Sequence, residues 1–416
     1  MFTGLSLDQA PPFKAPLKFF LSAPIFAILG GLFLLFSNNF EIHSPNLIAS
    51  IHFITIGYML MIIFGALQQM LPVVAGAIIP KANLVANITY IFITTGLISF
   101  SFGFFFYKKV LFFISSILLL IGILFFVCIS LFKLFKVANK SYIVIGIIIS
   151  LCFFLVGFLF GAHLLISHAT QNITALHYDF ALIHYNYIFF GFIFLLIVSI
   201  TIQVVPMFWV ANSFTKNEQK ITILSTTLLL LFYFFNILFD LDFNYIYKFL
   251  LSIVSIFFVY ITIKKLLNRK RKLKDISVYF YITSMFFLAL GIIYWLIYEY
   301  LNLPLKPLII LLGLGFTISL MNGMLYKIVP FLTWFHLSSK GFFDIPTMRD
   351  MIPIKKMQIQ YFIHIISILF FIIGFLFHIN IVIYIAIIFF IISNLMFLIN
   401  IYNSAKIYFI KQNQTT

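Results

Sequence analysis

The sequence predicts an all-α, polytopic membrane protein of about twelve transmembrane helices, arranged as three quasi-equivalent four-helix repeats. Hydrophobic residues make up 63% of the 416 residues and charged residues only 9%, whereas a soluble domain is about 45–50% apolar and about 25% charged. The mean hydropathy of +1.16 requires most of the chain to meet lipid or other helices. At roughly 20 to 25 residues for each span, the chain has room for about a dozen spans.

The apolar segments define the expected elements in order along the chain. We expect spans at 18–38, 47–78, 84–107, 110–132, 142–167, 180–211, 221–239, 245–263, 276–300, 305–335, 358–379 and 381–401. The loops between them are short, and the longest, at about 336–356, is too short for a soluble domain. We therefore expect a single transmembrane domain over 1–416. The first apolar run has no small-residue cleavage site after it, so we also expect an uncleaved chain.

The basic residues predict an orientation. When the amino terminus is placed in the cytoplasm, 21 of the 26 basic residues fall in cytoplasmic segments, four fall outside and Lys327 lies within a helix. Positive residues collect in cytoplasmic loops, so both termini are expected there. The net charge of +16 thus reflects topology and gives no support to nucleic-acid binding. The basic run 269–272 is interpreted as a stop-transfer anchor beside acidic lipid headgroups, with the lipid bilayer as the partner.

One motif recurs on the second, sixth and tenth spans. It consists of glycine and an aromatic residue, a small residue, then Gln or Lys, then proline, at constant spacing. Its members are Gly57, Gly65, Gln69 and Pro72, then Gly191, Ser199, Gln203 and Pro206, then Gly315, Gly323, Lys327 and Pro330. The prolines lie 134 and 124 residues apart, which is four spans each time. This predicts repeats at roughly 1–140, 141–270 and 271–416.

The motif has two interpretations. Small residues let helices approach closely, and a proline frees a backbone carbonyl that a Gln or Lys one turn earlier can satisfy. A tightly packed inner helix with a kink explains the motif by itself. The alternative is a pathway lined by the three spans. Lys327 is expected to extend to the cytoplasmic surface, with a transport path as the other interpretation.

This arrangement resembles a known architecture. Twelve helices in three four-helix units, with special residues on the second, sixth and tenth, resemble subunit I of the haem-copper oxidases and the NnrS family, which is associated with haem and copper. The segments 65–74, 203–208 and 324–331 are similar to a little-characterised bacterial branch of this group. The resemblance implies the bacterial inner membrane, haem or copper as cofactor, and respiratory or metal-handling membrane proteins as partners.

The histidines supply the candidate ligands. On the expected topology His52, His184 and His163 lie at similar depth, within ~10 Å of the outer boundary. By position, His52 resembles a haem ligand and His184 a copper ligand. His177, one heptad before His184, shares its helix face. Interfacial histidines also hydrogen-bond carbonyls and bind nothing, so a structural role stays open for each.

The sequence also departs from the oxidase pattern. The tenth span has no histidine over 308–315, and the seventh lacks the histidine pair expected over 221–239. We therefore expect metal binding without oxygen reduction, and we assign no catalytic residue. A single haem, a lone copper or a site that has lost its metal all stay open. A permease-like or channel-like transporter of a small solute is the alternative function, although few carboxylates lie within the spans.

Overall fold

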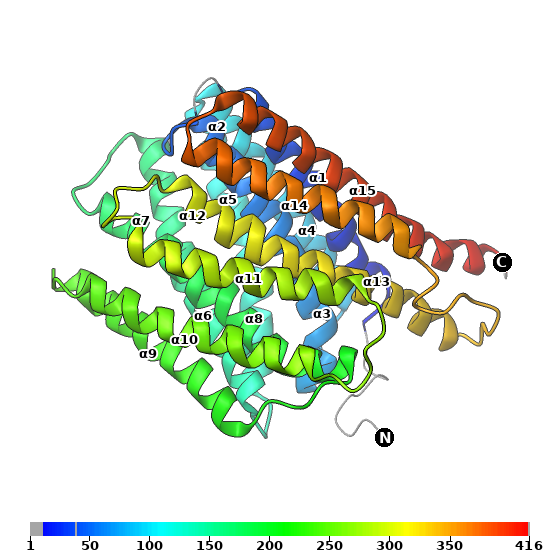
Figure 1. Cartoon of the computed structure of the whole chain (residues 1–416). Helices are drawn as coiled ribbons and strands as arrows, with labels where there is room; N and C mark the ends of the chain where they lie inside the picture. Colours follow the sequence, from blue (N-terminus) through cyan, green and yellow to red (C-terminus); the bar gives the residue numbers. More distant parts are fainter. Residues whose placement is uncertain (1–10, 38–39, 415–416) are drawn as a thin grey trace.

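The computed structural model describes residues 11–37 and 40–414, and every regular element among them is helical. Twelve helices in this part of the chain are long and apolar enough to cross a membrane, as the sequence predicts. They run roughly parallel and antiparallel in one bundle (Figure 1). The chain is therefore a multi-pass, all-α protein of the membrane type.

Nine of the twelve spans are uninterrupted α-helices over the described residues. They are α1 (Lys14–Leu35), α4 (Ala82–Phe106), α5 (Lys109–Phe135), α6 (Tyr142–Thr170), α9 (Lys216–Leu238), α10 (Asn244–Leu267), α11 (Ile276–Ile297), α14 (Ile354–Leu376) and α15 (Asn380–Asn413). The other three are composite: α2 (Pro45–His52), η2 (Phe53–Leu60) and α3 (Met61–Ala75); α7 (His177–Asn186), η3 (Tyr187–Phe194) and α8 (Leu195–Trp209); α12 (Lys306–Ile309), η4 (Ile310–Ile318) and α13 (Ser319–Ser338). We call these three the first, second and third central spans.

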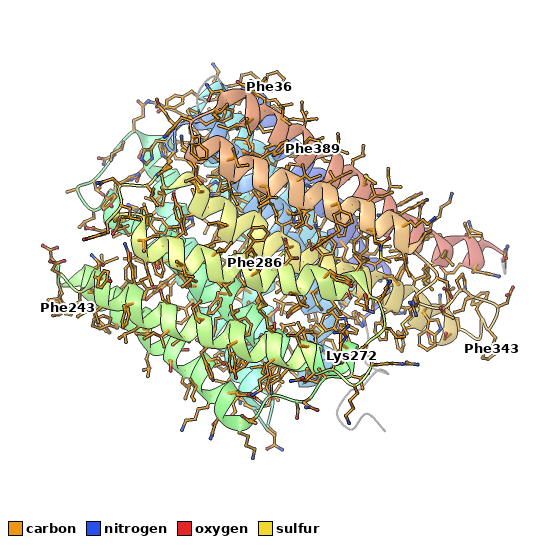
Figure 2. All side chains as sticks on the ribbon, viewed as in Figure 1. Phe36, Phe243, Lys272, Phe286, Phe343 and Phe389 are labelled. Atoms are coloured by element: carbon orange, nitrogen blue, oxygen red, sulfur yellow. The ribbon has the colours of Figure 1, made fainter. Side chains whose placement is uncertain are left out.

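The two ends of the bundle differ in composition. Figure 2 shows Phe243 and Lys272 at opposite ends of the molecule, near the two ends of α10. We call the end with Lys272 the basic end and the end with Phe243 the histidine end. Between them the outer surface is apolar, and Phe286 on α11 is 55% exposed. An apolar band of this kind suits contact with lipid chains.

Local sequence signals fix where several helices begin and end. Thr215 and Glu218 form a capping box at the start of α9, with the Glu218 amide 3.2 Å from the Thr215 hydroxyl. Asp275 caps α11 by accepting the Ser277 amide at 3.0 Å. Gly76, at φ 65°, ends α3 in the left-handed conformation that glycine adopts without strain.

Each central span contains a π-helical segment, which the sequence did not predict. The first segment, 53–60, shifts by 134 residues onto the second, 187–194, and by 124 more onto 311–318 within the third. These are the spacings of the three prolines. A wide helical turn recurring at one repeat position supports the predicted triplication, and π-helical segments concentrate at functional sites.

The glycine of each motif packs against a phenylalanine on the preceding helix. A Cβ atom at Gly57 would lie 2.5 Å from the Cβ of Phe26, and one at Gly191 would lie 2.7 Å from that of Phe153. Gly315 meets Phe287 in the same way, at 2.7 Å from its Cγ. The three contacts connect equivalent helices, so the motif glycines permit close helix approach, as expected.

Two turns further along, the small residue of the motif makes a second repeated contact. Gly65 and Gly323 face the phenylalanines Phe19 and Phe280, whereas Ser199 in the second repeat faces Gly146. In the second repeat the glycine, Gly146, lies on the preceding helix, and the larger residue of this pair, Ser199, lies on the central span. The combined volume is kept low enough for the helices to pack closely in all three repeats.

The repeats join in a closed ring with the central spans inside. Helices α5 and α6 pack together at one junction, α10 and α11 at the next, and α15 packs against α1 at the third (Figure 1). In the central apolar window of the three central spans 67–89% of the residues are buried, against 33–67% in the other spans. The expected boundaries at 140 and 270 lie in interhelical connections and stay predictions.

The last helix differs most from its expected bounds. It was expected to end at residue 401 and continues to Asn413. The added turns are amphipathic, and they pack onto the chain start and the end of α13. The ring of Tyr408 lies 4.2 Å from that of Phe13, and Lys340 donates to the Tyr408 hydroxyl at 3.1 Å. These contacts with other parts of the protein cover one face of the added turns, where a membrane span would contact lipid.

Candidate metal site at the histidine end

His52 lies at the junction of α2 and η2, where the first central span widens. Its Nδ1 is 2.8 Å from the carbonyl oxygen of Ile48. A carbonyl oxygen only accepts hydrogen bonds, so Nδ1 carries the proton and the Nε2 lone pair is free. The ring lies against Phe100 on α4, with ring centroids 4.4 Å apart.

His184 lies on α7 and is held by the neighbouring helix α6. Its Nδ1 is 2.8 Å from the carbonyl oxygen of Gly157, so this ring also has its proton on Nδ1. Gly161, one turn further along α6, leaves room for the ring, because a Cβ there would lie 2.6 Å from Nδ1. Gly157 and Gly161 together thus position the imidazole ring of His184.

The same hydrogen bond occurs in the first repeat with a different residue. The Ser50 hydroxyl donates to the carbonyl of Gly30 at 2.7 Å. Ser50 and His184 are 134 residues apart, as are the motif prolines, and Gly30 and Gly157 occupy matching places on the first helix of each repeat. The bond is therefore part of the repeated fold. Histidine in the second repeat keeps it and adds a ring nitrogen, Nε2, that the bond does not use.

The structure places His52 and His184 at equivalent heights in the bundle, because each follows the first residue of its central span by seven positions. Neither Nε2 has a hydrogen-bond partner among the described residues, and neither is fully enclosed by protein atoms. Two imidazoles with free Nε2 lone pairs are thus present at the histidine end, one from the first repeat and one from the second.

His163 and His177 take other positions. The side chain of His163 is exposed on α6 and meets Phe180 edge to face, at 5.0 Å between ring centroids. His177 packs against His168, at 5.9 Å, and its Nδ1 is buried without a partner. His168 lies in the last turn of α6. Across residues 11–37 and 40–414, no three His, Cys, Asp or Glu side chains gather closely enough to hold a metal ion together.

The polar residues of the central-span motif behave differently in each repeat. The side-chain oxygen of Gln69 is buried and has no hydrogen-bond partner among the described residues. Gln203 is half-buried. Lys327 forms an ion pair with Asp275 at the start of α11. Both side chains of the pair are partly exposed, so the expected extension of Lys327 to the cytoplasmic surface stays a prediction.

Asp275 is the ion-pair partner that sequence reasoning missed. Burial raises the pKa of its carboxyl, but the Lys327 charge and hydrogen bonds from Lys327 and Ser277 outweigh burial and lower the pKa below its usual 3.8. The signal was present, because an aspartate directly before an apolar run is a helix-capping residue. The spacing of residues along the sequence could not show that Lys327 would lie next to Asp275 across the helix interface.

A further set of buried polar residues lies in the third repeat. Tyr326 donates to Gln360 at 3.1 Å and accepts from Asn400 at 2.9 Å, while Ser319 lies 2.9 Å from Nε2 of His364. His364 is fully buried. This network joins the third central span to α14 and α15.

Comparison with known proteins adds no relative. No protein-family model matches the sequence, and no curated protein matches it. What the chain resembles therefore rests on its own motifs and architecture.

Proposed function

We propose that this multi-pass membrane protein binds copper or haem iron through His52 and His184. The observation that carries the proposal is the common state of the two rings. Each Nδ1 is held by a carbonyl at 2.8 Å, and each Nε2 has no hydrogen-bond partner within residues 11–37 and 40–414. Hydrogen-bonding the second ring nitrogen to a carbonyl is the usual way proteins orient a histidine ligand.

The residues fit some metal centres better than others. Neutral imidazole is a good ligand for copper and iron. Copper(I) accepts two ligands, which suits a pair without a third histidine, cysteine or carboxylate close by in the described chain. Haem iron needs only one or two axial histidines. Bound copper or haem iron would supply a one-electron redox centre.

The wider setting follows from the proposed site. We place the protein in the bacterial inner membrane with both termini in the cytoplasm, so that the histidine end faces outward. Respiratory or metal-handling membrane proteins are then the partners that would use the metal. The lack of a histidine over 308–315 of the third central span argues for metal binding without oxygen reduction.

The deciding experiment is an absorption spectrum with metal analysis on the purified, detergent-solubilised protein. The same preparation is then titrated with copper(I) under reducing conditions and, separately, with haem. Binding of one equivalent of either is expected. A protein that retains neither metal and binds neither on titration contradicts the proposal.

A permease-like function is the second candidate. It is favoured by the buried polar network, which begins at Tyr326 on the wall of a cavity at the basic end. In this case Tyr326→Phe and Asn400→Leu would slow the flux of small ions into proteoliposomes and leave metal content unchanged. Unchanged flux in both variants would remove the candidate.

A further inference from the structure

A cavity of about 600 Å³ opens at the basic end, between the second and third central spans. Its apolar wall comes from the ends of α8 and α13, including Trp209, Phe331 and Trp334. Its rim comes from the connection between α10 and α11 and from the segment before α14. The cavity is thus apolar towards the membrane and charged towards the end of the bundle.

The rim is strongly cationic. Arg269, Arg271, Lys274, Lys327 and Arg349 line the cavity, and Asp275 is the one acidic residue among its lining residues. Since Lys327 pairs with Asp275, four positive charges are left without a carboxylate there. Arg269 and Arg349 each give one donor to a backbone carbonyl, at 2.9 and 3.5 Å. A guanidinium has five donors, so most stay available.

The basic connection is fixed to the cavity wall. The Lys270 amide donates to the carbonyl of Val210 at 3.1 Å. Val210 has φ 52°, a conformation that a β-branched residue adopts only where its surroundings impose it. Beside it, Trp209 donates to the Ser277 hydroxyl at 3.1 Å, and that hydroxyl donates to Asp275 at 2.7 Å. Backbone hydrogen bonding therefore holds the run 269–272 against the cavity wall.

The third repeat departs from the first two at this point. Gly76 and Val210 follow their motif prolines by four residues, and both end a helix in the left-handed conformation. The equivalent residue in the third repeat is Trp334, and there the helix continues to Ser338. The longer helix places an indole on the cavity wall, 36% exposed.

We propose that this cavity binds the phosphate group of an anionic ligand, with Arg269, Arg271 and Arg349 contacting the phosphate oxygens. Guanidinium groups bind phosphate through paired, charge-assisted hydrogen bonds. Basic pockets between helices at the cytoplasmic side of membrane proteins take phospholipid headgroups in this way. The phosphate belongs to an acidic phospholipid, whose chains meet the apolar wall, or to a soluble phosphate compound.

The test uses native mass spectrometry of the full chain from nanodiscs. One arm contains phosphatidylcholine with phosphatidylglycerol, and the other contains phosphatidylcholine alone with added inorganic phosphate. The cavity variant is Arg271→Gln with Arg349→Gln. Its matched control is Lys216→Gln with Lys220→Gln, which removes the same charge from exposed residues of α9.

Wild type is expected to retain one phosphatidylglycerol, or one phosphate, about tenfold more strongly than the cavity variant. The control should match wild type. Retention in the first arm alone assigns the site to a lipid, and retention in the second assigns it to a soluble phosphate. Equal losses in the cavity variant and the control would show general attraction to the basic end and overturn the proposal, as would no retention in either arm.

Discussion

The two ends of the second central span carry opposite kinds of chemistry. At the histidine end, His184 contributes a neutral ring whose proton is held by the Gly157 carbonyl and whose lone pair is free. At the basic end, Trp209 and Val210 border a cavity with four unpaired positive charges. The first suits a metal ion that accepts nitrogen lone pairs, and the second suits an anion.

Both ends arise where the repeats differ from one another. At the histidine end, serine, histidine and leucine occupy the same repeat position, as Ser50, His184 and Leu308. At the basic end, the helix stops in two repeats and continues past Trp334 in the third. The repeated contacts hold the helices of the bundle together. The positions at which the repeats differ carry the residues of the two candidate sites.

The largest effect is expected from exchanging residues between repeats at the histidine end. His184→Ser installs the residue that holds the equivalent bond in the first repeat, and His52→Asn installs the residue found at its repeat position, Asn186. Each should abolish measurable copper(I) binding in a chelator competition, because each removes one of two ligands. His43→Ala, at an exposed histidine, is the control. Wild-type affinity in both exchange variants would break the comparison.

A smaller effect is expected from Gly161→Ala. The added methyl group would enter the space of the His184 ring and separate Nδ1 from the Gly157 carbonyl. Loss of such an orienting bond typically weakens metal binding by about 10–100-fold. The matched control is Gly313→Ala, where a Cβ would meet only Met59, at 4.0 Å. Equal copper affinity in the two variants would mean that copper binding does not depend on how Gly157 and Gly161 position the ring.

The repeated glycine contacts give a prediction on stability. Gly57→Ala, Gly191→Ala and Gly315→Ala each force a methyl group against a phenylalanine, which should cost about 1–3 kcal/mol. Thermal unfolding in detergent measures the loss, again with Gly313→Ala as the control on the same span as Gly315. Similar losses at all three glycines would sharpen the threefold comparison. A loss confined to one would contradict it.

The smallest effect is expected at Asp275. Because its pKa is lowered in the folded state, its contribution to stability is present above the ordinary pKa of 3.8 and is lost as the pH falls through the lowered value. Asp275→Asn keeps a capping residue and should cost about 1 kcal/mol. The difference in unfolding free energy from wild type should stay constant from pH 8 to pH 5. A difference that vanishes within that range would exclude the ion pair.

Sequence reasoning recovered the helices better than the side-chain contacts. Long apolar runs define the twelve spans, and the proline spacing located the central three. The π-helical segments could not be predicted from the hydropathy pattern. A wide turn changes which side chains share a helix face, but it does not change the composition of the span. The added turns of α15 were missed because they pack through an amphipathic face and fall below the hydropathy of a span.

The candidate site stays a prediction. His52 and His184 were chosen by depth, and the structure shows each Nδ1 bonded to a backbone carbonyl. His163 and His177 shared that depth, but one faces outward and the other meets His168. Depth along a helix can be counted from the sequence. The direction of a ring, and the pairing of Lys327 with Asp275, depend on contacts between distant helices.

The most direct test of the central claim compares purified wild-type protein with the His52→Asn, His184→Ser double variant. Both are extracted from the same membranes and measured by absorption spectroscopy and metal analysis, with thermal unfolding to show that both are folded. Wild type should contain copper or haem near one equivalent, and the double variant should contain neither. Equal metal content in two folded proteins, or none in either after titration with copper(I) and haem, would contradict the account.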